Sequence, residues 1–138
     1  MSTANIDRTV AKTDAWIRLM ADELKTEDLK YAQRALRAFL HTLRDRLGVN
    51  QAAQLASQMP DLMRGIYYEN WTPARTPEHY RDLGTFLDRI ADHAGFHGET
   101  EASFAAAAGA EVLRRIVSAG EIEDVAASLP ASISLLIR

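Results

Sequence analysis

Hydrophobic residues recur at helical spacing along most of this chain. Leu36, Phe39, Leu40, Leu43 and Leu47 form the clearest series. Apolar side chains three and four positions apart lie on one face of an α-helix, so this series predicts an amphipathic helix. No run of alternating β-branched and aromatic residues indicates a strand. The pattern therefore predicts an all-α protein.

Three further long stretches carry stripes of the same kind. They are Trp16, Ile17, Met20 and Leu24; Phe86, Leu87, Ile90 and Ala94; and Phe104, Ala108, Val112, Leu113 and Ile116. The alanines at 105–108 favour helix and permit a neighbouring helix to approach closely. Thr26, followed by two acidic residues, predicts the start of the helix that contains the leucine series.

Two shorter stretches resemble each other and indicate an internal repeat. GVNQAAQLASQMPDLM begins at Gly48 and GEIEDVAASLPASIS begins at Gly120, with Leu55, Met59, Pro60 and Met63 corresponding to Val125, Leu129, Pro130 and Ile133. We expect the two glycines to end the long helices, because glycine readily takes the left-handed conformation beyond a helix end. The two prolines are expected to open short helices, where a missing N–H costs nothing.

These elements predict a single compact bundle over residues 1–138. It contains about eight helices, arranged as two four-helix pseudo-repeats over 9–68 and 80–138. The intervening 69–79 stretch includes Pro73 and Pro77 and lacks a long apolar pattern, so it is interpreted as an ordered loop. One four-helix unit alone would leave an apolar face open, so the two units are expected to share a core.

Composition narrows the function classes. The chain has no cysteine, which excludes a disulfide framework, a thiol nucleophile and a cysteine-ligated metal. Its net charge of −3 argues against a nucleic-acid partner, since such proteins are usually basic. There is no secretory signal and no apolar run long enough to span a bilayer. We therefore expect a cytoplasmic protein without a membrane partner.

The stretch HTLRDRLGVNQAAQLASQMPDLMRGIYYENWTPAR, from His41 to Arg75, resembles the bacterial DUF2267 family, a domain of unknown function. The most distinctive matches are LRDRL, the Gln-hydrophobic-Pro step and RGIYYENW, and the resemblance extends from about Val10 to Ile137. Met59 stands where a leucine is more usual in the family. The resemblance implies a small helical bacterial protein, and it supplies no activity or catalytic residues.

The first half carries polar and aromatic side chains that the second half lacks. We call them the first-half cluster: Arg37, His41, Arg44, Asp45, Arg64, Tyr67, Tyr68, Glu69 and Trp71. One interpretation is a binding surface for a protein partner or for a second copy of the chain. Another is that these side chains hold the connecting loop by ion pairs and ring packing. A third is a small-ligand or enzymatic pocket at the junction of the halves, where arginine forks would bind an anion.

Other candidate chemistry is weaker. His93 and His97 have a spacing that can hold a metal on a helix, but Gly95 lies between them, and no metal site is predicted. His41 and Asp45 could orient an imidazole, yet no nucleophile accompanies them, so no catalytic residue is assigned. No glycine-rich phosphate loop suggests a cofactor. The ridge Lys30, Arg34, Arg37, His41 and Arg44 could meet phosphates, but its acidic neighbours favour a solvated face.

Overall fold

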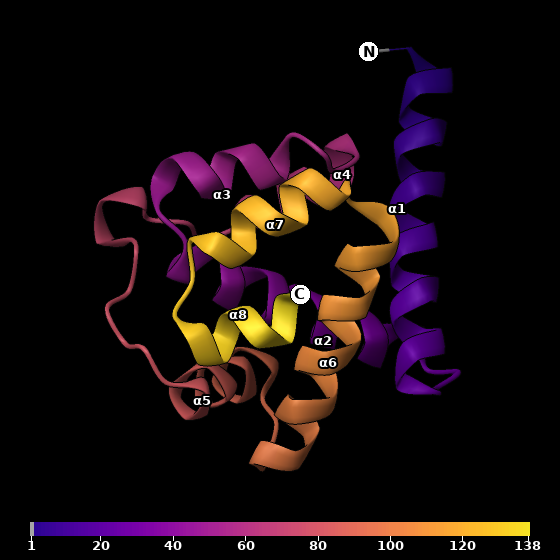
Figure 1. The fold of residues 1–138 in the computed structure, drawn as a ribbon. Helices are drawn as coiled ribbons and strands as arrows, with labels where there is room; N and C mark the ends of the chain where they lie inside the picture. The colour runs from indigo at the N-terminus through magenta and orange to yellow at the C-terminus, as the bar shows by residue number, and fades with distance from the viewer. Residues whose placement is uncertain (1) are drawn as a thin grey trace.

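The computed structural model describes residues 2–138, and this range contains α-helices and no β-strand. The helices are α1 (Thr3–Leu24), α2 (Leu29–Arg46), α3 (Val49–Ala56), α4 (Asp61–Tyr68), α5 (Leu83–Ala94), α6 (Glu99–Ile116), α7 (Ala119–Ala127) and α8 (Ala131–Ile137). A short 3₁₀ helix, η1 (Pro73–Arg75), interrupts the connecting loop. The predicted all-α bundle of eight helices is therefore confirmed (Figure 1).

Side-chain caps and left-handed residues define several helix ends. Asp28 Oδ1 accepts a hydrogen bond from the Tyr31 amide at 3.1 Å and starts α2, close to the predicted position. Asp82 caps α5 in the same way through the Thr85 amide. Lys25 ends α1 with φ 56°, and Gly95 ends α5 with φ 73°.

The prediction that Gly48 and Gly120 end the long helices is wrong. Gly48 is the N-cap of α3 with φ −66°, and Gly120 lies in the first turn of α7. The chain leaves α2 and α6 at Leu47 and Val117, both extended and both buried in the core. Because those side chains must turn inward, the exits need no left-handed residue. Pro60 and Pro130 precede α4 and α8 directly, as predicted.

The core lies where α2 and α6 pack against each other and against α1 and α5. Leu36, Phe39, Leu40, Leu43 and Leu47 are almost fully buried, as the leucine series predicted. The facing side of α6 is built from small residues, namely Ala102, Ala105, Ala106, Gly109 and Ala110. This face lets the two long helices approach closely.

Phe104 does not belong to the buried face of α6, contrary to the predicted stripe. Its side chain is 66% exposed, and Ile116 at the end of the same helix is 39% exposed. The alanines on the other side of the helix occupy the core instead, because the large side chains of α2 leave room only for small partners. Phe104 therefore lies on the surface.

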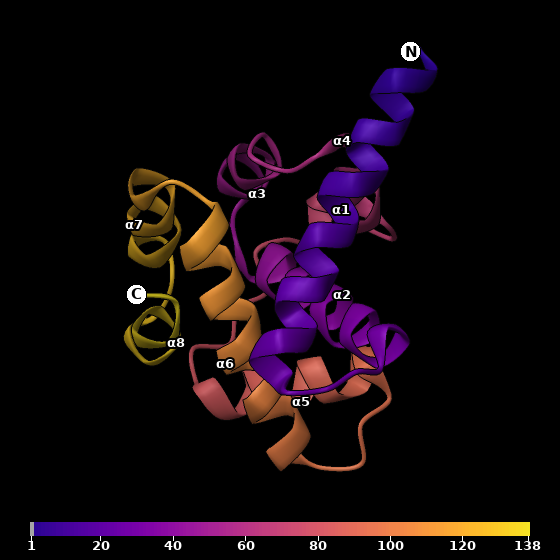
Figure 2. The same ribbon diagram turned by 90° about the vertical axis from the view of Figure 1, so that its right-hand side faces the viewer.

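Among the shorter helices, α7 packs against both α3 and α8, whereas α4 packs against α1 and α2. Helix α3 packs against α7, where Gln51 and Gln54 donate hydrogen bonds to the buried carboxylate of Glu121 at 2.7 and 2.8 Å. The N-terminal part of α1 extends beyond the rest of the bundle in both ribbon views (Figure 2). None of the helices within residues 2–138 combines the length and the apolar character needed to cross a bilayer.

The helix order agrees with the expected sequence of two long and two short helices in each half. Helices α2 and α6 both contain 18 residues, and each is followed by two short helices. Helix α1, with 22 residues, is longer than α5, with 12. That residues 10–68 and 80–137 superpose as equivalent units stays a prediction.

Candidate functional site

Arg44 forms a buried anchor between α2 and the end of α4. Its side chain is only 2% exposed, and its Nη1 donates to the carbonyl oxygens of Tyr67 at 2.6 Å and Glu69 at 2.7 Å. Its Nε also donates to Asp45 Oδ1 at 2.9 Å. The last carbonyls of a helix have no partner within the helix, so this guanidinium completes the C-terminus of α4.

The neighbouring His41 completes the same helix end. Its Nε2 lies 2.7 Å from the Ile66 carbonyl oxygen. Because a carbonyl only accepts, Nε2 must carry the proton, and Nδ1 of the neutral ring keeps its lone pair. Burial lowers the pKa of His41 below its ordinary value, and the charges of Arg44, Arg37 and His93 lower this pKa further, against the opposing effect of the Ile66 carbonyl.

One face of His41 borders a small polar pocket between α2 and α5. We call it the α2–α5 pocket; it is lined by Arg34, Arg37, Ala38, His41, Asn70 and His93 and has a volume of about 190 Å³. The His41 and His93 rings meet edge to face with centroids 6.1 Å apart. Asn70 joins the lining because its left-handed backbone, with φ 60°, turns the chain just after α4. Asparagine tolerates this conformation better than most residues.

The two arginines of the pocket have different partners. Arg37 Nη2 donates to Glu69 Oε2 at 2.9 Å, and both side chains are almost half exposed. The Arg34 guanidinium lies 5.4 Å from the Tyr31 ring centroid and 5.9 Å from that of Phe96. Within residues 2–138 no carboxylate pairs with Arg34, so its N–H donors are available to a ligand.

The remaining members of the first-half cluster stabilise the turn regions around α4. Arg64 donates to the carbonyls of Ala56 and Met59, which closes the turn between α3 and α4. Tyr67 is fully buried and donates to the Ala52 carbonyl at 2.9 Å. Tyr68 stacks on Trp71 with ring centroids 5.0 Å apart. These contacts hold the start of the connecting loop against the bundle.

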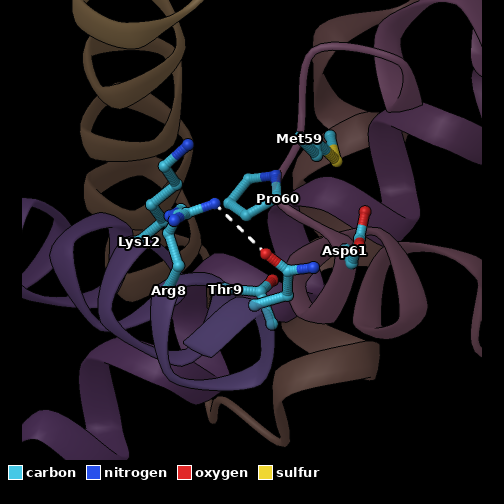
Figure 3. Close-up of a pocket in the computed structure, with 7 residues that line it drawn as sticks. Arg8, Thr9, Lys12, Met59, Pro60 and Asp61 are labelled. Carbon is cyan, nitrogen blue, oxygen red and sulfur yellow. Dashed lines mark hydrogen bonds between the residues drawn. The ribbon is translucent and has the colours of Figure 1, made fainter. Parts of the chain in front are cut away.

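A second hollow lies beside the projecting part of α1 (Figure 3). Arg8, Thr9 and Lys12 line one side and Met59, Pro60 and Asp61 the other, around about 270 Å³. Lys12, Met59 and Pro60 also line an adjoining hollow of about 460 Å³ that reaches Trp16 and Ile116. These hollows form a wide surface groove, in which Arg8 is already hydrogen-bonded to Asn5.

The sequence profile of an uncharacterized conserved protein family, DUF2267, matches residues 13–136. The chain belongs to the DUF2267 family. The match covers nearly the whole sequence, which confirms the resemblance seen in the motifs around His41–Arg75. Among curated proteins, no sequence matches this chain.

In this DUF2267 chain the structure divides the first-half cluster into separate groups. Arg37 and His41 line the α2–α5 pocket, with Glu69 bound to Arg37. Arg44, Asp45 and Tyr67 belong to the anchor beneath, and Arg64, Tyr68 and Trp71 to the neighbouring turns. The binding role of each residue stays a prediction, but the cluster does not form one continuous exposed surface.

Three polar residues of the pocket, together with Ala38, lie outside the first-half cluster. Arg34 belongs to the basic ridge, and its spacing of three from Arg37 puts the two on one face of the helix. The sequence spacing relates His93 to His97, whereas the structure brings the His93 ring against that of His41. Asn70 gave no signal beyond its position in the connecting loop. Within residues 2–138 no three histidine, aspartate or glutamate side chains cluster as metal ligands would.

Proposed function

We propose that this protein is a binding protein whose ligand is a small oxyanion held in the α2–α5 pocket. The observation that carries the proposal is the convergence of Arg34, Arg37 and His93, from two long helices, on one pocket of about 190 Å³. The pocket lies between α2 and α5. Arginine forks match the geometry of carboxylate and phosphate oxygens.

The size and the chemistry of the pocket support a small charged ligand. Drug-sized ligands usually occupy about 300–1,000 Å³, so this pocket suits a compact anion or the charged end of a larger molecule. Arg34 has free donors, and Asn70 adds an amide. The Arg44 anchor fixes the backbone at Glu69, next to Asn70, so this side of the pocket is held in place before a ligand arrives.

Titration calorimetry with inorganic phosphate at low ionic strength tests the proposal. Arg34→Gln and Arg37→Gln should each weaken phosphate binding roughly tenfold, since each removes a charge-assisted hydrogen bond. Arg18→Gln is the matched control, because Arg18 is an exposed arginine paired with Asp14 and does not line the pocket. Equal losses in all three variants would mean that only net charge matters, and the proposal would then be wrong.

The second candidate function is protein–protein interaction through the projecting part of α1. Ile6 and Val10 lie one turn apart there and are 47% and 49% exposed. They lie on the same helix segment as Arg8, Thr9 and Lys12, which line the neighbouring groove. A protein partner or a second copy of the chain would cover apolar side chains that the monomer leaves in water.

Sedimentation over a range of protein concentrations tests the simplest form of this candidate, self-association. An increase in mass with concentration in the wild type, abolished by Ile6→Glu with Val10→Glu, would support it. Phe104→Glu is the control, because Phe104 is also exposed but lies on α6. A monomer at all concentrations would remove the second copy as the partner.

A further inference from the structure

The Arg37–Glu69 ion pair bears on which anion the α2–α5 pocket binds and on what weakens that binding. We propose that the pocket takes a tetrahedral phosphate-type oxyanion and that the Glu69 carboxylate competes with it for Arg37. The inference rests on the proposed function of the α2–α5 pocket. It adds the ligand class and an internal competitor to that function.

The ion pair places a carboxylate on an arginine that lines the pocket. Arg37 Nη2 and Glu69 Oε2 are 2.9 Å apart, while Arg37 itself lines the pocket beside Arg34 and His41. The backbone of Glu69 is fixed, because its carbonyl oxygen accepts from Arg44 Nη1. The Glu69 side chain is 43% exposed and has no other hydrogen bond within residues 2–138. It can therefore leave Arg37 without disturbing the anchor.

This competition discriminates between anions. A tethered carboxylate has a high effective concentration near Arg37, so a free monocarboxylate that makes the same single contact gains little by replacing it. An anion with more oxygens can replace Glu69 on Arg37 and also bind Arg34, which no carboxylate pairs with in residues 2–138. Phosphate has the charge and the number of acceptors for both arginines at once.

The origin of the lining residues in three segments of the chain favours a tetrahedral group over a planar one. Arg34 and Arg37 belong to α2, His93 to the last turn of α5, and Asn70 to the loop after α4. Polar side chains from three segments can contact a ligand on several sides, and a tetrahedral group offers oxygens in all those directions, whereas a carboxylate offers two oxygens in one plane. Free phosphate and the phosphoryl group of a larger molecule share the chemistry that this arrangement recognises.

The test compares Glu69→Gln with a matched control in calorimetric titrations at low ionic strength. The probes are inorganic phosphate, glycerol 3-phosphate and acetate. Glu69→Gln should bind phosphate about two- to fivefold more tightly than the wild type, the range expected for an exposed ion pair. Glu123→Gln is the control, because Glu123 is exposed and pairs with Arg138 at the same 2.9 Å, yet it does not line the pocket. It should leave the affinity for phosphate unchanged.

The outcomes separate this inference from the proposed function. Unchanged affinity in Glu69→Gln, together with a loss in Arg37→Gln, would overturn the competition and leave the binding site in place. Acetate binding as tightly as phosphate would overturn the ligand class. No binding of any probe to the wild type or to Glu69→Gln would overturn the proposed function as well. Tighter binding of glycerol 3-phosphate than of phosphate would support the inference and assign the phosphoryl group of a larger molecule.

Discussion

Each half of the molecule ends in a short helix whose last carbonyls bind an arginine from the preceding long helix. In the first half, Arg44 donates to the carbonyls of Tyr67 and Glu69 at the end of α4. In the second half, Arg114 donates to those of Leu136 and Ile137 at the end of α8. Since both halves use this device, the arginine is part of the fold and does not by itself indicate a binding site.

The difference between the halves lies around that arginine. The residue three positions before it is His41 in the first half and Glu111 in the second. Glu111 binds both Arg114 and Arg115, so the charges on α6 balance locally. His41 binds a carbonyl and carries no negative charge, and the arginines of the α2–α5 pocket lie beside it. The two halves therefore differ in the charge balance around the anchoring arginine.

Replacing the two anchoring arginines is expected to give the largest difference between the halves. Arg44→Met should reduce the free energy of unfolding by about 3–5 kcal/mol. The change removes the guanidinium that binds two carbonyl oxygens and the half-buried Asp45 carboxylate, and it leaves these groups without a partner. Arg114→Met should cost about 1 kcal/mol, since its side chain is 33% exposed and water can replace the bonds. Urea denaturation followed by circular dichroism measures both values.

Similar losses in the two variants would contradict this comparison. They would show that burial of Arg44 by the connecting loop does not increase the stability that this arginine contributes. The loop contributes its own contacts there, since the Glu78 amide donates to the Asp45 carbonyl at 2.8 Å and Arg46 Nε donates to the Tyr80 carbonyl.

The contact between Phe39 and Gly109 gives a second, intermediate test. These residues meet where the two long helices cross, and a Cβ at position 109 would lie 2.5 Å from Phe39 Cγ. Gly109→Ala should therefore reduce the free energy of unfolding by about 1–3 kcal/mol through overpacking. Gly65→Ala is the control, because nothing lies within 4 Å of a Cβ there and alanine favours helix.

The unfolding midpoint in urea should fall for Gly109→Ala and stay or rise for Gly65→Ala. Adding Phe39→Leu to Gly109→Ala should restore part of the loss by removing the ring that the new methyl group meets. If the double variant lost more unfolding free energy than the two single variants lose together, the clash would not be the cause.

Much of this fold follows from local patterns. The leucine series of α2 and the two prolines predicted their elements correctly, and the helix start expected at Thr26 lies two residues before the Asp28 cap, because periodicity and capping act over one or two turns. The errors arose where tertiary packing decides. Leu47 and Val117 are drawn into the core and displace the helix ends from the glycines, and the side chains of α2 select alanines over Phe104.

The candidate site depended on contacts between distant segments. The surplus of polar residues in the first half was visible in the sequence, but its division into an anchor and a pocket was not. Arg37 and Arg44 are both arginines on the same helix, yet one is 44% exposed and the other 2%. Only the path of the loop after α4 decides this, and no periodic pattern encodes that path. The pairing of His93 with His41 has the same origin.

The smallest expected effect concerns the pH dependence of stability, and it tests the His41–Glu111 difference directly. Since burial lowers the pKa of His41 in the folded protein, the unfolded chain binds more protons on this residue below its ordinary pKa of about 6.5. The neutral ring thus contributes stability that is fully present above pH 6.5 and is lost as the pH falls through the lower folded pKa.

His41→Gln keeps a donor for the Ile66 carbonyl but cannot be protonated. The carboxylates are common to both proteins, so their effect cancels in the difference in unfolding free energy between wild type and His41→Gln. This difference should be constant above pH 6.5. Below pH 6.5 the wild type should lose stability relative to His41→Gln. Parallel pH profiles from urea denaturation would show that His41 is charged as easily in the folded protein as in the unfolded chain, and the first half would then have no neutral histidine to set it apart from Glu111.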